Sequence, residues 1–324
     1  MRKLIVAITL VGSLASIGGA VAQDWPTRPV TMVIPFAAGT GADVLGRLFA
    51  ERLTEFLGRQ VIIENVPGAG SMIGASRVAK ATADGYQFVF GTSGAFAYSQ
   101  TLYKNPLYNA AMDFAPVALV AEAPFVLVAS KHLPASNLQE FIAYTKENHG
   151  KMQYGSPGVG SSNHLSCELL NSAIGINVTH IPYRAGLPIS SQDLIAGRID
   201  YMCLSVAAAL SLLGHTKPIA ILTKNRSPSV PELPSAHEQG LTDFDVDVWY
   251  AIFLPKNTPL PIIRKLHDAT LAAMNTRSLQ EQAKQIGVDL VAPERRSPEY
   301  LQKFVENEIE KWAAVIRAAG VTAQ

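Results

Sequence analysis

Short runs of β-forming residues alternate with helical patterns along most of the chain. The first run, residues 30–35, is followed by a glycine-containing turn and by apolar residues at helical spacing over 44–57. Gly58 comes directly after the last of them, and glycine commonly follows a helix end. Strands and helices that alternate in this way are typical of βαβ units, which form mainly parallel sheets. The pattern therefore predicts an α/β fold.

The same reasoning assigns the rest of the chain. We expect further strands at residues 61–64, 87–90, 117–121, 125–130, 152–155, 178–181, 199–204, 218–222 and 246–254. We expect further helices at 72–79, 136–148, 163–174, 189–196, 261–275, 279–285 and 298–319. A capping box of Ser136 and Gln139 is expected to open the second of these helices. Ser297 as N-cap and Pro298 at the first helical position are expected to open the last.

The amino terminus has the features of a secretory signal peptide. Arg2 and Lys3 precede an apolar stretch at residues 4–17, and Ala20-Val21-Ala22 supplies a small-x-small cleavage pattern. A membrane anchor is the alternative, but the apolar stretch is short for a span and two glycines interrupt its end. We expect residues 1–22 to be removed and the protein to be exported to the periplasm.

The length then predicts two domains. Removing 22 of the 324 residues leaves 302, which suits two domains of ordinary size. The last helices are too few to build a third sheet, so we expect them to return to the first domain. Domain 1 is then residues 23–123 and 250–324, and domain 2 is residues 124–249. The chain would cross between them twice, near residues 121–126 and 246–252, and these crossings would act as a hinge beside a cleft.

Charge and cysteine content narrow the partners. Without residues 1–22 the chain has 25 Lys and Arg against 26 Asp and Glu, a net charge of −1, so we expect no nucleic-acid partner. Cys167 and Cys203 could form a disulfide in an oxidising compartment, but free, buried cysteines are the favoured interpretation. No His/Cys cluster has zinc spacing and no cofactor motif is present, so we predict neither metal nor cofactor. A monomer is expected.

Two glycine-containing loops, one in each predicted domain, lie between a strand and a helix. They cover residues 35–43 (PFAAGTGAD) and 155–164 (GSPGVGSSNH). Backbone N–H groups at a helix N-terminus, together with the helix dipole, can bind an anion such as a carboxylate. The alternative is that the glycines only permit tight turns and the serines only cap helices. The pairing of two such loops favours an anion site between the domains.

Individual side chains near these loops have alternative roles. Asp43 would compete with an anion for the same N–H groups, so capping is its expected role. His164 could donate to a ligand or only pack locally, and Arg184 could clamp a carboxylate or face solvent. Tyr183 and Phe36 could form apolar walls or belong to the core. The predicted ligand-binding set is Phe36, Ala38, Gly39, Thr40, Ala42, Asp43, Thr92, Ser93, Ser156, Gly160, Ser161, Ser162, His164, Tyr183, Arg184, Ala185 and Ser205.

The sequence contains no convincing enzyme motif. Neither glycine loop is followed by the Lys-Ser/Thr pair of a phosphate-binding loop. The stretch GTSGA at residues 91–95 has alanine where a nucleophile elbow needs its second glycine. A secreted hydrolase with Ser93 or Ser161 as nucleophile and His164 as base is the alternative, but no third group orients that histidine. We therefore predict a binding protein and no catalytic residues.

The ordered motifs of the chain resemble a known family, the solute receptors of tripartite tricarboxylate transporters, also called Bug or TctC-like proteins. The motifs in the first half are WPTRPV at 25–30, IPF at 34–36, ENVPGAG at 64–70, ADGY at 83–86 and DFAPV at 113–117. Those in the second half are YGS at 154–156, IPYR at 181–184, AGRID at 196–200, VPELP at 230–234 and Trp312. The resemblance covers essentially the whole mature chain.

The resemblance implies a type II periplasmic binding protein-like fold, in which two α/β domains close on a small carboxylate. It also implies delivery to the membrane permease subunits of a tripartite transporter, although a receptor that feeds a two-component sensor would look the same. In this family the loops matching residues 36–43 and 156–164 typically hold one ligand carboxylate, partly through waters.

Three positions depart from the family pattern. Thr40 stands where the family commonly has glycine, and Ala185 stands where it usually has glycine or a small polar residue. Cys203-Leu204-Ser205 stands where many members have Phe-Asp-Asn. The loss of that aspartate disfavours an amino-acid ligand relative to a plain mono- or dicarboxylate.

Overall fold

The computed structural model describes residues 25–183, 187–242, 244–318 and 320–322, so the predicted signal peptide lies outside the described residues. Within them the strands form a ten-stranded sheet in the order β2-β1-β3-β9-β4-β7-β5-β6, with β10 and β8 also paired to β4. The strands are β1 Val30–Ile34, β2 Val61–Asn65, β3 Gln87–Thr92, β4 Phe114–Ala129, β5 Gln153–Ser156, β6 Thr179–Pro182, β7 Tyr201–Ser205, β8 Lys217–Ile221, β9 Asp247–Pro255 and β10 Asp289–Leu290. The order places early and late segments of the chain side by side.

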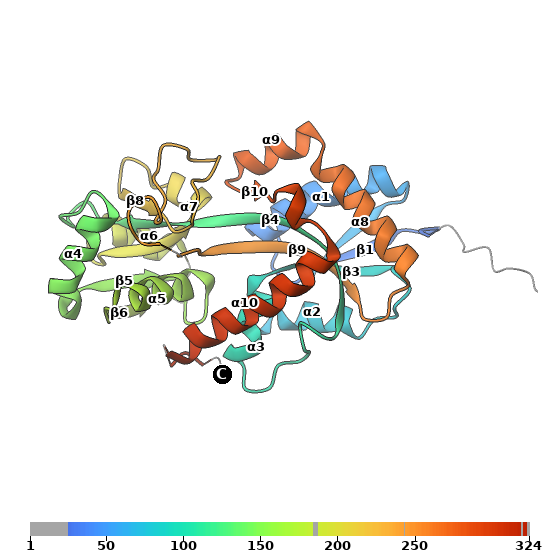
Figure 1. The fold of residues 1–324 in the computed structure, drawn as a ribbon, viewed down its shortest axis with the longest axis horizontal. Coiled ribbons are helices and arrows are strands. Elements are labelled where there is room, and N and C mark those ends of the chain that lie inside the picture. The colour runs from blue at the N-terminus through green and yellow to red at the C-terminus, as the bar shows by residue number, and fades with distance from the viewer. Residues whose placement is uncertain (1–24, 184–186, 243, 319, 323–324) are drawn as a thin grey trace, which may run out of the picture.

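The helices divide between two ends of this elongated molecule (Figure 1). They are α1 Gly41–Leu57, α2 Met72–Ala79, α3 Ser99–Leu102, α4 Leu138–Asn148, α5 Ser162–Ile174, α6 Leu187–Ile195, α7 Val206–Leu210, α8 Leu260–Met274, α9 Arg277–Gln285 and α10 Pro298–Ala318. We call β1–β3, β10, α1–α3 and α8–α10 the first lobe, and β5–β8 and α4–α7 the second lobe. The last three helices pack in the first lobe, where α8 and α9 contact α1 and α10 contacts α3.

Two long strands connect the lobes. β4 pairs with β9 and β10 in the first lobe, and from Phe125 onward it pairs with β7 and β8 in the second. The sequence predicts two separate extended runs here, because Glu122 and Pro124 interrupt the apolar pattern. Both residues nevertheless lie within the β4–β9 pairing, so the two runs are one strand of 16 residues.

Most predicted elements are confirmed to within a few residues, and one cap is corrected. Residue pairing is parallel where β1 meets β2 and β3 and where β5 meets β6 and β7, as βαβ units require. Every pairing of β4 and β9 is antiparallel, so the sheet is mixed and not mainly parallel as expected, because the two long strands that join the lobes run against their neighbours. The N-cap of α4 is Asn137, whose side chain accepts from the amide of Glu140 at 2.9 Å. The expected pair Ser136 and Gln139 is therefore wrong by one residue, because two adjacent residues could both cap. A π-helical turn at Gly94–Tyr98 and the short helices α3 and α7 were not predicted.

Cys167 and Cys203 form a disulfide, so the preference for free cysteines is wrong. Cys167 lies on α5 and Cys203 on β7, and α5 packs directly on β7 in the second lobe. This packing brings the two Cα atoms to 5.5 Å, well within the range a disulfide spans. The pairing depends on tertiary packing that the separation of 36 residues does not reveal.

Candidate anion-binding site

The first glycine loop precedes α1 and is closed by a capping arrangement. Thr40 is the N-cap, and its hydroxyl accepts from the amide of Asp43 at 3.4 Å. The Asp43 carboxylate reaches back and accepts from the amide of Gly39 at 2.8 Å. Gly39 has φ of +82°, a left-handed conformation that favours glycine. The sequence assigns Asp43 a capping role, and the structure places it at the third helical position behind the true N-cap.

Asp43 is fully engaged inside the protein. Its carboxylate also accepts from Nε of Arg47 at 3.0 Å and from Nδ2 of Asn65 at 2.9 Å, and the residue is only 2% exposed. The hydrogen bond from Arg47, followed by those from Gly39 and Asn65, outweighs burial and lowers the pKa of Asp43 to about 2. Asp43 therefore remains charged and orders the loop.

The second glycine loop, which precedes α5, repeats this arrangement with a histidine in place of the aspartate. Ser161 is the N-cap and accepts from the amide of His164 at 3.2 Å. Nδ1 of His164 accepts from the amide of Gly160 at 3.1 Å, and Gly160 has φ of +77°. Because Nδ1 accepts this N–H group, the ring must be neutral with its proton on Nε2. His164 thus orders the second loop as Asp43 orders the first.

A second histidine, His180, packs on His164 and contacts the start of the second loop. The rings of His164 and His180 stack with their centroids 3.9 Å apart, and Nε2 of His180 lies 2.7 Å from the Ser156 hydroxyl. Burial, with a smaller contribution from His180, lowers the pKa of His164 to about 3, and burial lowers that of His180 to about 4. Both rings are therefore neutral near pH 7 and serve the structure of the loop.

The two arrangements leave equivalent amides free. In each loop the residue three positions after the N-cap accepts from the glycine before the N-cap. In the portion of the chain that the structure describes, no hydrogen bond involves the amides of Gly41 and Ala42 in the first loop or of Ser162 and Asn163 in the second. These four N–H groups lie at the positive ends of two helices, where an anion is stabilised.

The remaining predicted residues divide into groups. Several polar side chains are used internally: Ser156 contacts His180 and Gly158, Ser161 donates to Gly158, Tyr183 donates to Asp193 at 2.7 Å and Ser205 caps α7. Ser93 is fully buried, whereas Phe36, Ala38, Gly39, Thr40, Gly160 and Ser162 retain exposure and Thr92 is 4% exposed. Ala42 is itself buried, although its amide is unpaired. Arg184 and Ala185 lie outside the described residues.

Leu204 does not face a ligand. It is fully buried in the second-lobe apolar cluster, with Val126, Leu194 and Ile221 among its members. Because the side chain of Leu204 is buried, it cannot contact a ligand. The replacement of aspartate by leucine at this position therefore gives no direct means of rejecting an amino group.

Two serines that could act as nucleophiles are not paired with a base. Among the described residues, no hydrogen bond joins the hydroxyl of Ser93 or Ser161 to the imidazole of His164. Nε2 of His164 instead lies 3.7 Å from Oε1 of Glu168, and Nδ1 accepts from the amide of Gly160. The hydrolase alternative has no geometry to support it here.

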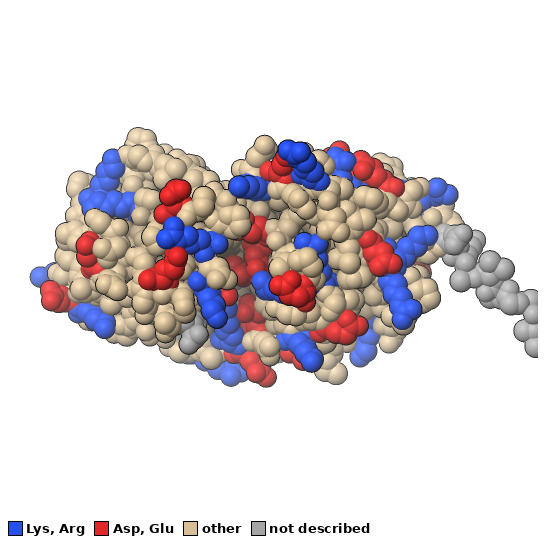
Figure 2. Space-filling model, turned by 45° about the horizontal axis from the view of Figure 1, so that its top comes forward, with Lys and Arg blue, Asp and Glu red and all other residues tan. Residues whose placement is uncertain are grey.

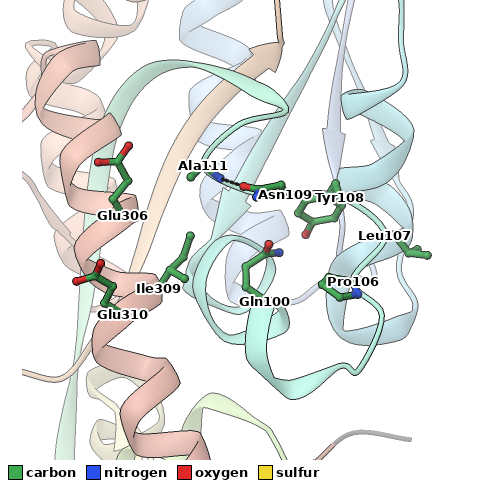
Figure 3. A pocket seen from close by; sticks show the side chains of 9 residues that line it. All are labelled: Gln100, Pro106, Leu107, Tyr108, Asn109, Ala111, Glu306, Ile309 and Glu310. Carbon is green, nitrogen blue, oxygen red and sulfur yellow. Dashed lines mark hydrogen bonds between the residues drawn. The ribbon is translucent and has the colours of Figure 1, made fainter.

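Two cavities away from the glycine loops are unsuited to an anion. One of about 670 Å³ between α3 and α10 has Glu306 and Glu310 on its wall (Figure 3). The side-chain oxygens of Gln100 and Asn109 in this cavity already accept hydrogen bonds from backbone amides.

The second cavity lies at the junction of the lobes. Figure 2 shows acidic side chains gathered in a hollow between the lobes. The cavity, of about 320 Å³, has four acidic side chains in its lining, Glu122, Asp245, Asp247 and Asp289, against three basic ones, Lys224, Arg226 and Arg295. Burial, followed by the charges of Glu122, Asp245 and Glu308, raises the pKa of Asp247 well above its usual range.

Sequence reasoning missed Tyr250, Asn65 and His180. The hydroxyl of Tyr250 lies 3.9 Å from the point where a Cβ on Gly41 would stand, so it reaches the first loop. The sequence predicts only that the segment containing Tyr250 is an extended strand. The alternation of residues along that strand does not indicate which of its two faces lies against the first glycine loop. Asn65 stands in the ENVPGAG motif, and that was the one available signal for it.

His164→Ala is expected to weaken the second loop. Without the ring, the partly buried amide of Gly160 loses its acceptor and the stacking on His180 is lost, and together these losses should cost about 1–3 kcal/mol. We expect a loss of unfolding free energy of this size at pH 7 in chemical denaturation. His215→Ala, at an exposed histidine of the same lobe whose side chain makes no hydrogen bond among the described residues, is the control and should change stability by less than about 0.5 kcal/mol.

The pH dependence provides a second measurement for the same variant. The unfolded chain takes up a proton on His164 below its usual pKa of 6.5, whereas the folded chain does so only near 3. The free energy of unfolding therefore falls as the pH drops from about 6.5 toward 3, and His164→Ala should make this fall shallower. An unchanged slope would contradict the neutral, accepting role of His164.

The fold and site define a two-lobed α/β binding protein of the periplasmic binding protein class. The family model described as "Tripartite tricarboxylate transporter family receptor" matches residues 45–321. The protein belongs to that family. Within the described chain, none of the helices is both long and apolar enough to cross a membrane.

Individual relatives agree with this assignment. Protein BugT of Bordetella pertussis is 31% identical, with 99% of this chain and 98% of that protein covered. The solved structure of the periplasmic binding protein BugD is 35% identical, with a TM-score of 0.75 and coverage of 93% of this chain and 100% of that one. Rpa4515 of R. palustris with adipate is also 35% identical, with a TM-score of 0.78 and coverage of 92% and 99%. MatC of Rhodopseudomonas palustris with bound malate is 35% identical, with a TM-score of 0.76 and coverage of 90% and 100%.

Proposed function

We propose that this protein captures a small organic mono- or dicarboxylate in the periplasm for a tripartite tricarboxylate-type transporter. The observation that carries the proposal is the pair of matched loops, each with two unpaired amides at the start of a helix. A carboxylate can accept several such N–H groups, and hydrogen bonds to a charged acceptor are stronger than neutral ones. The malate and adipate in the related structures are carboxylates too.

The proposed mechanism is closure of the two lobes about the strands that join them. We assign residues 23–123 and 250–324 to one domain and residues 124–249 to the other, after removal of a signal peptide at 1–22. Support comes from β4 and β9, whose pairing continues to Pro124 and Asp247 at the junction. Contacts across the junction include the Ser227 hydroxyl, which donates to Asp289 at 2.6 Å. Ligand binding would shift an equilibrium between open and closed arrangements.

The ligand-contacting groups in this proposal are the unpaired backbone amides of the two loops together with the hydroxyl of Thr92. We assign Gly41 and Ala42 from the first loop, Ser162 and Asn163 from the second, and Thr92 at the end of β3. Asp43 and His164 hold the loops in shape. Arg184 stays a candidate for a distal carboxylate, because it follows β6 in the second lobe.

The proposed protein binds and releases its ligand without a reaction. It would act as a monomer and hand the ligand to the membrane permease subunits of the transporter. Delivery to a sensor is the second possibility, and cross-linking in the native cell would distinguish the two by the partner recovered.

A thermal-shift screen with a panel of carboxylates tests the function directly. A ligand at 100 times its Kd stabilises the folded state by about 2.7 kcal/mol, which should raise the Tm by roughly 5 °C. We expect such shifts with malate, adipate or similar acids. The diamide of a responding acid, which has the same length but no charge, is the control. Equal shifts by acid and diamide, or no shift with any acid, would contradict the proposal.

A further inference from the structure

A buried tyrosine on one of the connecting strands reaches the first anion loop. Tyr250 lies on β9, where it pairs with Thr92 of β3 and Ala121 of β4. Its ring stacks on Phe90 with centroids 5.9 Å apart, and the residue is 7% exposed. Its hydroxyl lies 3.9 Å from the position that a Cβ on Gly41 would occupy. The phenol therefore ends beside the first helical residue of α1, where an amide is unpaired.

The hydroxyl of Tyr250 has no hydrogen-bond partner among the described residues. Other buried tyrosines satisfy theirs: Tyr108 donates to the carbonyl of Ala95 and Tyr201 to Asn171, each at 2.6 Å. A buried phenol normally finds a partner, because leaving it unpaired is costly. The hydroxyls of Ser93 and Tyr98 also lack partners, but those two are sealed from solvent and that of Tyr250 is not. Tyr250 can thus meet a ligand or a water.

The groups at the start of α1 are suited to binding a carboxylate. Burial raises the pKa of Tyr250 to about 12, so the phenol keeps its proton and can donate. The amides of Gly41 and Ala42 beside it are donors at the positive end of a helix of 17 residues. The carboxylate of Asp43, two residues after Gly41 on the same helix, is already bound by Gly39, Arg47 and Asn65. Three donors therefore lie at the start of α1, and no hydrogen bond joins any of them to an acceptor among the described residues.

We propose that the Tyr250 hydroxyl donates a hydrogen bond to the same ligand carboxylate that the amides of Gly41 and Ala42 hold. This inference rests on the proposed function. Because β9 runs beside β4 from one lobe toward the other, the contact also ties the ligand to a connecting strand. A ligand bound here would thus contact the segment about which the lobes move.

Tyr250→Phe tests the proposal because it removes the hydroxyl and keeps the ring that stacks on Phe90. We expect calorimetry to show a Kd about 10- to 100-fold higher for the carboxylate that binds the wild-type protein best, as for the loss of a hydrogen bond to a charged group. Tyr98→Phe, which removes another unpartnered hydroxyl from the first lobe, should leave that Kd within about twofold.

The stability of the ligand-free proteins separates a binding role from a structural one. Tyr250→Phe removes no hydrogen bond within the protein, so its Tm without ligand should equal or exceed that of the wild type. A Kd within about twofold of wild type, or a large drop in the ligand-free Tm, would overturn the inference about Tyr250. If the wild-type protein bound no carboxylate, the proposed function would fail, and this inference would fail with it.

Discussion

Cys167→Ser together with Cys203→Ser is expected to lower the free energy of unfolding by about 4 kcal/mol. The disulfide closes a loop with a sequence separation of 36, and the chain-entropy relation for a loop of this length gives roughly that value. The bond joins α5 to β7, and α5 begins at the second anion loop. Chemical denaturation of the oxidised wild type and the double variant measures the difference.

Loss of the disulfide should also weaken ligand binding. Nδ2 of Asn163 donates to the carbonyl of Cys203 at 2.8 Å, so the strand that carries Cys203 also positions the start of α5. We therefore expect weaker ligand binding in the double variant as well as lower stability. Wild-type protein treated with a reductant is the matched control and should behave like the double variant. Equal stability of oxidised and reduced wild type would show that the disulfide contributes nothing.

Asp43→Asn is expected to produce the second large effect, on both stability and affinity. The carboxylate has three donors, and its pKa of about 2 against an ordinary value of 3.8 corresponds to about 2 kcal/mol of stability at pH 7. An asparagine can accept from Gly39 but cannot pair with Arg47 in the same way. The first loop should lose its shape, so we also expect the Kd for the ligand to rise by at least about tenfold.

A matched control for Asp43 exists in the same lobe. Arg277 and Glu281 form another pair four residues apart on a helix, but both are exposed. Glu281→Gln should therefore cost less than about 0.5 kcal/mol. The pH dependence adds a check with a defined sign. A lowered pKa gives stability that is present above about pH 4 and lost as the pH falls toward 2, and Asp43→Asn should remove this part of the acid dependence. Equal losses in the two variants would contradict the role of Asp43.

The sequence predicts the elements and the anion loops because both follow from local rules. Alternating apolar runs identify strands and helices without knowledge of packing. Each loop combines a glycine, a hydroxyl N-cap and a following helix, and these features are contiguous in the chain. Thr40 and Ser161 are the N-caps of α1 and α5, whereas the sequence assigns the capping of the first loop to Asp43.

What the sequence does not predict depends on contacts between distant segments. The disulfide requires α5 to pack on β7, and the partner of the Gly160 amide depends on which way the ring of His164 turns. Tyr250 could face either side of β9, and only the pairing with β3 and β4 decides which. The continuity of β4 through Glu122 and Pro124 likewise follows from its pairing with β9, which local pattern cannot supply.

The central claim is that the unpaired amides of the two glycine loops, one loop from each lobe, hold a single negatively charged group. A crystal structure with a bound carboxylate tests this claim most directly. With adipate or the best acid from the screen, we predict a carboxylate within hydrogen-bond distance, directly or through one water, of the amides of Gly41 or Ala42 and of Ser162 or Asn163. A carboxylate bound by only one loop, or seated in the acidic cavity at the lobe junction, would contradict the account.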